Sequence, residues 1–302
     1  MSATLLSGGY AILAAILWAF SSSMLEDIAK KIPPKELNIF KGGIAILLLT
    51  ATSLLLGEDF GHLPWKDVLQ LILSGVIGIG LGDTAYYAGL KDIGSRRALL
   101  LFALAPPMTA LIAWVFLGEK LDLLAWSGIL ITMVGVGWVV TERTPQDAVS
   151  RESKTLHRGI LMGVLASLGQ AVGLVLSRSA MSDGAITSLQ SAALRLTAGV
   201  LFTLLWVFAG RQPLGKWRHD ADRKKIWKLL GLTAFIGTYI CLWLQQLAVQ
   251  GAPAGITQTL LSTSPVFILP IAALRGEKLS GRAVLGALLS IFGVMLVFGL
   301  IG

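Results

Sequence analysis

The chain has 302 residues, of which 55% are apolar and only 14% are charged. Its apolar runs exceed what a single soluble core of this length can bury, so the composition predicts an integral membrane protein. The formal net charge of +8 is spread over short connections without a compact basic module, which excludes a nucleic-acid-binding protein as the favoured interpretation.

Ten apolar segments each have about the 20 residues that an α-helix needs to cross a bilayer. In chain order they are predicted at residues 8–25, 36–56, 67–90, 95–117, 121–140, 158–177, 186–209, 226–249, 253–274 and 282–301. The connections between them are too short to hold a soluble catalytic domain. The sequence therefore predicts an all-α integral membrane protein with ten transmembrane helices.

Lys and Arg are concentrated in the connections that follow the odd-numbered helices. Of the 25 basic residues, 21 lie there or at the adjoining helix ends, whereas Lys66, Lys120 and Arg178 lie on the other side. The positive-inside rule then predicts a multi-pass protein of the plasma membrane, which is the inner membrane in a bacterium, with both termini outside.

Residues that could carry redox or metal chemistry are scarce. Cys241 is the only cysteine and lies inside a predicted helix, which excludes an intramolecular disulfide and a thiolate zinc site. The three histidines, His62, His157 and His219, all lie in connections. We therefore expect no cofactor and no metal.

A sequence repeat divides the chain into two halves. The stretch LGEKL at residues 117–121 returns as RGEKL at residues 275–279. The same offset aligns three further pairs, which are Pro107 with Pro265, Gly128 with Gly286, and Gly135 with Gly293. Conserved order and spacing favour an internal duplication. Further upstream the offset is slightly smaller and places Lys41 opposite Arg195.

The predicted repeats comprise residues 1–141 and 158–302, joined by a charged connection at 142–157. Each repeat has five helices, and because this number is odd, the second repeat must enter the membrane with the opposite orientation. Two inverted repeats are typical of secondary transporters, whose substrate site lies near the midplane between the halves.

Four features are shared with a known family. They are the motif LWAFSS at residues 17–22, the basic residues Lys41 and Arg195 near the start of helices 2 and 7, a proline halfway along helices 4 and 9, and LGEKL at the end of helix 4. With these features the chain resembles, over nearly its whole length, the EamA family of the drug/metabolite transporter superfamily. The resemblance implies export of amino acids or related metabolites through a cavity lined mainly by helices 1, 3, 4, 6, 8 and 9. Many relatives have cytoplasmic termini, opposite to the charge bias here.

Polar and aromatic residues recur at helical spacing on the helices that the repeat would place centrally. We predict a substrate-binding cavity with aromatic walls formed by Trp18, Ser22, Asp83, Tyr86, Tyr87, Gln170, Arg195, Tyr239, Trp243, Gln246, Gln258 and Ser262. For each of the polar residues, interhelical hydrogen bonding is the alternative role.

Only Asp83 and Arg195 place a charge well inside a predicted span, where an ionisable group is a functional candidate. Lys41 is predicted within about 3 Å of the depth of Asp83, so the two are expected to pair. Arg195 lacks a corresponding carboxylate because Cys241 occupies the position equivalent to Asp83. Backbone carbonyl groups and water could solvate its guanidinium, the side chain could reach towards Asp83, or it could receive a substrate carboxylate.

Three sequence features have alternatives that do not involve the substrate. Glu119 is expected in the first turn of the following helix, where the helix dipole favours a negative charge. The prolines at 106, 107, 265 and 270 either kink their helices or leave free carbonyls facing a cavity. The run GVIGIGLGD at residues 75–83 predicts a close-packing face.

The leading functional hypothesis is a secondary transporter that exports amino acids or similar small polar metabolites by alternating access. A flippase for a lipid-linked intermediate is the alternative, and a lateral opening would favour it. A membrane-embedded enzyme is less favoured, since the sequence has no HExxH or GxSxG motif and no histidine within a span. The expected partners are a small-molecule substrate and the lipid bilayer, with a homodimer allowed and no nucleic acid.

Overall fold

The computed structural model describes residues 3–29, 31–140, 153–211, 214–215, 222–274 and 280–297, among which there are helices and no strand. The helices are α1 (Ala3–Ala29), α2 (Pro34–Leu55), α3 (Trp65–Ser74), η1 (Gly75–Asp83), α4 (Thr84–Phe102), α5 (Ala105–Leu117), α6 (Leu123–Val140), α7 (Ser153–Ala180), α8 (Ser188–Ala209), α9 (Arg223–Ala234), η4 (Phe235–Ile240), α10 (Cys241–Gly251), α11 (Ala254–Leu261), α12 (Ser264–Leu274) and α13 (Gly281–Val297). The second GEKL copy and most of the charged connection lie outside the described residues.

The all-helical prediction is confirmed, and the length and composition of the helices agree with a membrane protein. Seven stretches of the described residues are long and apolar enough to cross a membrane: Leu5–Ser22, Pro34–Leu55, Trp65–Ile93, Leu100–Leu117, Thr155–Ala180, Ser188–Ala209 and Arg223–Gly251. The apolar helices Leu123–Val139 and Gly281–Val297 are shorter. The predicted segment 253–274 is divided between α11 and α12, so ten uninterrupted spans are not seen.

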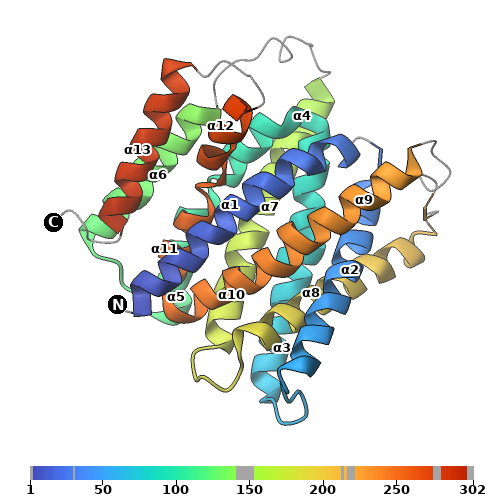
Figure 1. The fold of residues 1–302 in the computed structure, drawn as a ribbon. Helices are drawn as coiled ribbons and strands as arrows, with labels where there is room; N and C mark the ends of the chain where they lie inside the picture. The colour runs from blue at the N-terminus through green and yellow to red at the C-terminus, as the bar shows by residue number, and fades with distance from the viewer. Residues whose placement is uncertain are drawn as a thin grey trace.

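The connection expected between residues 90 and 95 is wrong, because α4 continues through it from Thr84 to Phe102. No proline interrupts this stretch. Arg158 of α7 also fixes it from outside: Nε and Nη2 each donate to one carboxylate oxygen of Asp92 at 2.7 Å. Figure 1 shows α4 beside α7 in this part of the molecule.

Prolines interrupt two of the predicted helices at equivalent places in the two halves. Pro106 follows the break between α4 and α5, and Pro265 follows the break between α11 and α12. Proline has no N–H to donate to the carbonyl four residues before it, so the helical hydrogen bonding is broken in the turn before each proline. Hydroxyl groups bond the carbonyls near these breaks: Ser167 Oγ donates to Leu101 O at 2.8 Å, and Thr263 Oγ1 donates to Leu260 O at 2.6 Å. These contacts favour the structural role of the prolines.

α6 and α13 pack closely through the glycines that the repeat aligns with one another (Figure 1). A Cβ on Gly135 would lie 2.5 Å from the backbone nitrogen of Ser290 and 2.6 Å from the carbonyl oxygen of Gly286. A Cβ on Gly128 would lie 2.7 Å from the carbonyl oxygen of Gly293. The two helices can approach this closely only because these positions carry no side chain.

We expect Gly135→Ala to destabilise the protein by about 1–3 kcal/mol, since the new methyl group meets backbone atoms that only a shift of the whole helix can move. Gly137→Ala in the same helix is the matched control, because its Cβ would meet only a side-chain methyl of Leu100 at 3.4 Å. Thermal unfolding in detergent measures both. Equal melting temperatures for the two variants would contradict this account of the helix crossing.

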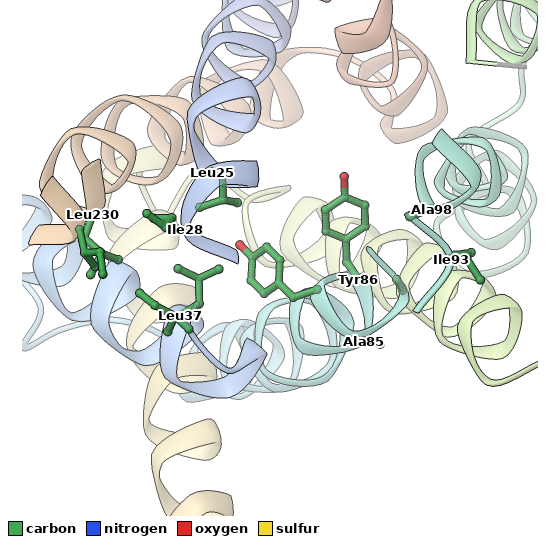
Figure 2. Close-up of a cluster of buried hydrophobic side chains, with 12 residues drawn as sticks. Leu25, Ile28, Leu37, Ala85, Tyr86, Ile93, Ala98 and Leu230 are labelled. Carbon is green, nitrogen blue, oxygen red and sulfur yellow. The ribbon is translucent and has the colours of Figure 1, made fainter. Parts of the chain in front are cut away.

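One end of the bundle is filled by a cluster of buried apolar side chains. Figure 2 shows Leu25 and Ile28 of α1, Leu37 of α2 and Leu230 of α9 on one side of this cluster, with Tyr86 of α4 beside them. Part of the cluster lies where α1 ends and where α2 and α9 begin, and α4 contributes the rest of the side chains that Figure 2 labels.

Candidate functional site

A cavity of about 100 Å³ lies between helices of both halves of the chain. Its polar lining comes from α2, η1, α7, α8, η4, α10 and α11, in the form of Asn38, Lys41, Asp83, Gln170, Arg195, Thr238, Cys241, Gln245 and Gln258. Trp18 of α1 and Phe102 of α4 add aromatic walls. The cavity therefore combines two cations, one carboxylate and several neutral hydrogen-bonding groups.

Lys41 is buried, with 4% of the residue exposed. Aromatic side chains contact its ammonium group. Nζ donates to the hydroxyl of Tyr87 at 3.0 Å and lies 5.2 Å from the centre of the Trp18 ring. Both contacts suit a desolvated cation, because the face of an aromatic ring carries partial negative charge.

The expected ion pair between Lys41 and Asp83 is wrong. Among the described residues, neither Lys41 nor Arg195 has a carboxylate oxygen within 4.0 Å. The reason is geometric: Tyr87 lies one helical turn beyond Asp83, and its hydroxyl takes the hydrogen bond from Lys41. Asp83 is only partly buried and lines the same cavity as the two cations.

Arg195 is the most unusual side chain of the cavity. The residue is 1% exposed, yet Nε and Nη1 of its guanidinium are buried without a hydrogen-bond partner among the described residues. Its backbone packs against η1, where a Cβ on Gly75 would lie 2.8 Å from the carbonyl carbon of Arg195. Burying a charged donor without an acceptor costs free energy, so these two nitrogens set Arg195 apart from the other side chains that line the cavity.

Five of the twelve predicted site residues line the cavity: Trp18, Asp83, Gln170, Arg195 and Gln258. Two of them also contact each other across the helices, since Gln170 Nε2 of α7 donates to Gln258 Oε1 of α11 at 3.4 Å. Tyr87 reaches the site indirectly through its hydrogen bond to Lys41.

The remaining predicted residues lie outside the lining. Tyr86 belongs to the apolar cluster of Figure 2 and packs against Phe102 with a ring separation of 5.2 Å. The hydroxyls of Tyr239 and Thr52 hydrogen-bond at 2.7 Å. The other residues absent from the lining are Ser22, Trp243, Gln246 and Ser262.

Gln246 instead connects three helices away from the cavity. Its Oε1 accepts hydrogen bonds from Ser177 Oγ of α7 and, at 3.0 Å, from Ser191 Oγ of α8. The interhelical role that the sequence left open is therefore the one that the geometry of Gln246 favours.

Asn38, Thr238 and Gln245 line the cavity without having been predicted from the sequence. Lys41 was predicted only as the partner of Asp83, and Cys241 only as the repeat equivalent of Asp83, yet both also line the cavity. Residues 238, 241 and 245 have helical spacing, so the periodicity of the sequence could have identified them as one face of a helix. The interpretation chose positions 239, 243 and 246 instead, which form the neighbouring face of the same helix.

Glu119 was expected in the first turn of the following helix, but α6 begins only at Leu123. Its Oε1 accepts a hydrogen bond from Arg178 Nε at 3.0 Å, and its Oε2 accepts one from the backbone N–H of Ala254, the first residue of α11, at 2.8 Å. Arg178 Nη1 also donates to the carbonyl of Val249 at 2.9 Å. Glu119 thus neutralises the N-terminus of a distant helix and joins the two halves of the chain at this end.

The residue pattern of the EamA-like transporter family matches this chain twice, over residues 6–141 and 157–299. The chain belongs to this family. Together with the apolar helices, this membership makes it a multi-pass membrane protein and a membrane transporter of the drug/metabolite transporter type.

Individual proteins similar to this EamA-like chain are distant in sequence. Uncharacterized transporter YyaM of Bacillus subtilis is 25% identical over 241 residues, covering 78% of this chain and 75% of YyaM. Protein PA1977 of Pseudomonas aeruginosa is 32% identical over 143 residues, which are 46% of this chain and 45% of PA1977. Mouse solute carrier family 35 member G1 is 25% identical and is covered over 44% of its length.

A solved crystal structure shares the fold of this EamA-like protein. The TM-score is 0.78, and the match covers 98% of this chain and 96% of that chain at 18% sequence identity. At this identity the likeness establishes the fold and carries no information about the substrate.

Proposed function

We propose that this protein is a secondary transporter that exports amino acids or similar small polar metabolites by alternating access through the central cavity. The observation that carries the proposal is Arg195, whose buried guanidinium beside the cavity has two nitrogens that no described residue accepts from. Nε and Nη1 lie on different edges of the planar guanidinium, so a substrate carboxylate bound along either edge would supply an acceptor for one of these two nitrogens.

The other groups of the cavity favour a substrate that also carries a positive charge. Asp83 is partly buried and has no cation within 4.0 Å among the described residues, so it is available to a substrate ammonium group. Lys41 is already held by Tyr87 and Trp18. A zwitterion would place its carboxylate at Arg195 and its ammonium at Asp83, with Gln170 and Gln258 bonding neutral polar groups.

Alternating access in this proposal uses two inverted five-helix repeats, residues 1–141 and 158–302. The proposal is supported by the reciprocity of the α6–α13 crossing, where Gly128 opposes Gly293 and Gly135 opposes Gly286. The repeat aligns 128 with 286 and 135 with 293. Exchanging the two halves therefore turns the contact between 128 and 293 into the contact between 286 and 135. Ser290 Oγ donates to Thr132 O at 3.5 Å, and these two residues are repeat equivalents that meet each other.

We expect the purified protein in liposomes to move a small amino acid or related metabolite without ATP, since the chain has no Walker motif and no segment large enough to bind a nucleotide outside the membrane. Liposomes preloaded with a mixture of labelled amino acids are assayed for release, with protein-free liposomes as the control. Release that requires added ATP, or no release of any amino acid, would contradict the proposal.

The orientation that we propose has both termini outside the cytoplasm of a plasma membrane. It is supported by the Lys and Arg bias, and Figure 1 places the start of α1 and the end of α13 toward the same end of the molecule. A phosphatase that folds only outside the cytoplasm should be active when fused to the C-terminus. An inactive phosphatase together with an active cytoplasmic reporter at the same position would reject this orientation.

A flippase remains the second candidate because an apolar groove of about 900 Å³ borders η1. In this alternative the groove admits a lipid-linked substrate laterally. A dithionite assay of fluorescent lipids in the same liposomes separates the two functions, since only a flippase exposes inner-leaflet lipid to the reagent.

A further inference from the structure

The groove beside η1, which we call the lateral groove, has a volume of about 900 Å³. Its floor is one face of η1 and α4, and includes Ile77, Leu81 and Ala88. Leu165 and Leu168 of α7 form one wall, and the end of α8 with the start of α2 forms the other. The volume is in the range of sites that hold a molecule of several hundred daltons.

The lateral groove opens between helices that are apolar enough to cross the membrane, so its opening faces lipid. Leu81, Leu165 and Leu168 are 42%, 44% and 42% exposed, respectively, although they are large apolar side chains. In a bilayer such surfaces contact acyl chains. The apolar part of the groove therefore suits a hydrocarbon chain better than a polar metabolite.

One end of the lateral groove is cationic. Lys35 lies at this end with its ammonium 3.7 Å from the centre of the Trp206 ring. No described residue accepts a hydrogen bond from this ammonium. The neighbouring Glu36 is 4% exposed and accepts a hydrogen bond from the backbone N–H of Gly215 at 2.7 Å, so its carboxylate points into protein.

Further basic residues lie on segments that neighbour α2. Lys31 donates to Asp222 at 2.7 Å and lowers the pKa of that carboxyl, which joins the end of α1 to the start of α9. Phe40 of α2 packs edge-on against Trp227 of α9. α9 therefore begins beside α2, and its first turns carry the exposed residues Arg223, Lys224, Lys225 and Lys228. Such a cluster attracts anionic lipid headgroups.

We infer that the lateral groove is a binding site for a phospholipid with an anionic headgroup, with its acyl chain along η1 and α7 and its phosphate at Lys35. Trp206 lies where an aromatic residue at the membrane interface is expected. The opposite face of η1 lines the central cavity through Ile79 and Asp83, so the bound lipid and the transport substrate lie on two sides of one helix. This site does not depend on the identity of the transported substrate.

Native mass spectrometry of the delipidated protein with added phosphatidylglycerol or phosphatidylcholine tests the site. Ala88→Trp and Leu168→Trp each fill the groove and should remove the bound phosphatidylglycerol, whereas Leu130→Trp on the exposed face of α6 should not. Lys35→Gln should reduce the affinity for phosphatidylglycerol about fivefold and leave phosphatidylcholine unchanged. Lys66→Gln, on the exposed start of α3, is the charge control.

Melting temperatures without lipid identify variants that fail to fold. The two groove-filling substitutions are on different helices, so that if one variant fails to fold the other still tests the site. Equal lipid binding by the wild type and both folded groove-filling variants would overturn the inference. So would equal phosphatidylglycerol affinities for Lys35→Gln and Lys66→Gln. A lipid-free dimer that Ala88→Trp disrupts would assign the groove to a second copy of the chain and reject the lipid.

Discussion

Arg195→Gln is expected to weaken binding of carboxylate-bearing substrates about 10- to 100-fold, because hydrogen bonds to a charged group contribute about 1.5–3 kcal/mol each. Arg195→Lys keeps the charge but loses the planar pair of donors, so its affinity should lie between those of the wild type and Arg195→Gln. Saturable uptake into liposomes gives the Michaelis constant for each variant.

Stability separates a binding role of Arg195 from a structural one. Two buried nitrogens of the guanidinium have no acceptor in the part of the chain that the structure describes, so replacing it with a neutral amide should leave the melting temperature unchanged or raise it. A structural arginine would instead destabilise the fold when removed. Arg158→Gln is the matched control for a structural arginine. Its side chain is largely exposed and pairs with Asp92, so this variant removes an arginine that has a protein partner. Unchanged substrate affinity in folded Arg195→Gln would refute the assignment.

Gly75→Ala is expected to produce the largest loss of stability. A Cβ at this position would overlap the carbonyl oxygen of Arg195 and lie 3.0 Å from its Cα, and backbone atoms inside a packed helix cannot move aside. Overpacking of this kind typically costs about 1–3 kcal/mol, and more where the neighbour is rigid. Because η1 or α8 must shift, substrate affinity should fall together with the melting temperature.

Gly43→Ala in α2 is the control for this variant, because nothing lies within 4 Å of its added methyl group. Alanine favours a helix over glycine by about 1 kcal/mol, so the control should be neutral or slightly stabilising. Gly75→Ala is thus predicted to lower the stability, and Gly43→Ala is predicted not to lower it. Thermal unfolding in detergent measures both, and similar destabilisation by the two would show that the Gly75 contact is not tight.

The sequence predicts where helices form better than it predicts which face of each helix lines the cavity. Apolar length predicted the α-helical membrane class, because each backbone polar group must be bonded within its own segment in lipid. Helical spacing also predicted polar faces, yet at residues 238–246 the face that lines the cavity contains Thr238 and Gln245, next to the predicted Tyr239 and Gln246. Rotation of a helix about its axis depends on its neighbours, which hydropathy does not specify.

The sequence by itself determined the all-helical class, the family, and the glycines and prolines at equivalent places, because these depend on composition, order and local backbone geometry. Only the tertiary structure decided that Lys41 bonds Tyr87, that Glu119 accepts from the start of α11, and that Nε and Nη1 of Arg195 meet no acceptor among the described residues. Each of these depends on which residues from distant segments meet within hydrogen-bonding distance. At that range, one turn along a helix changes the partner.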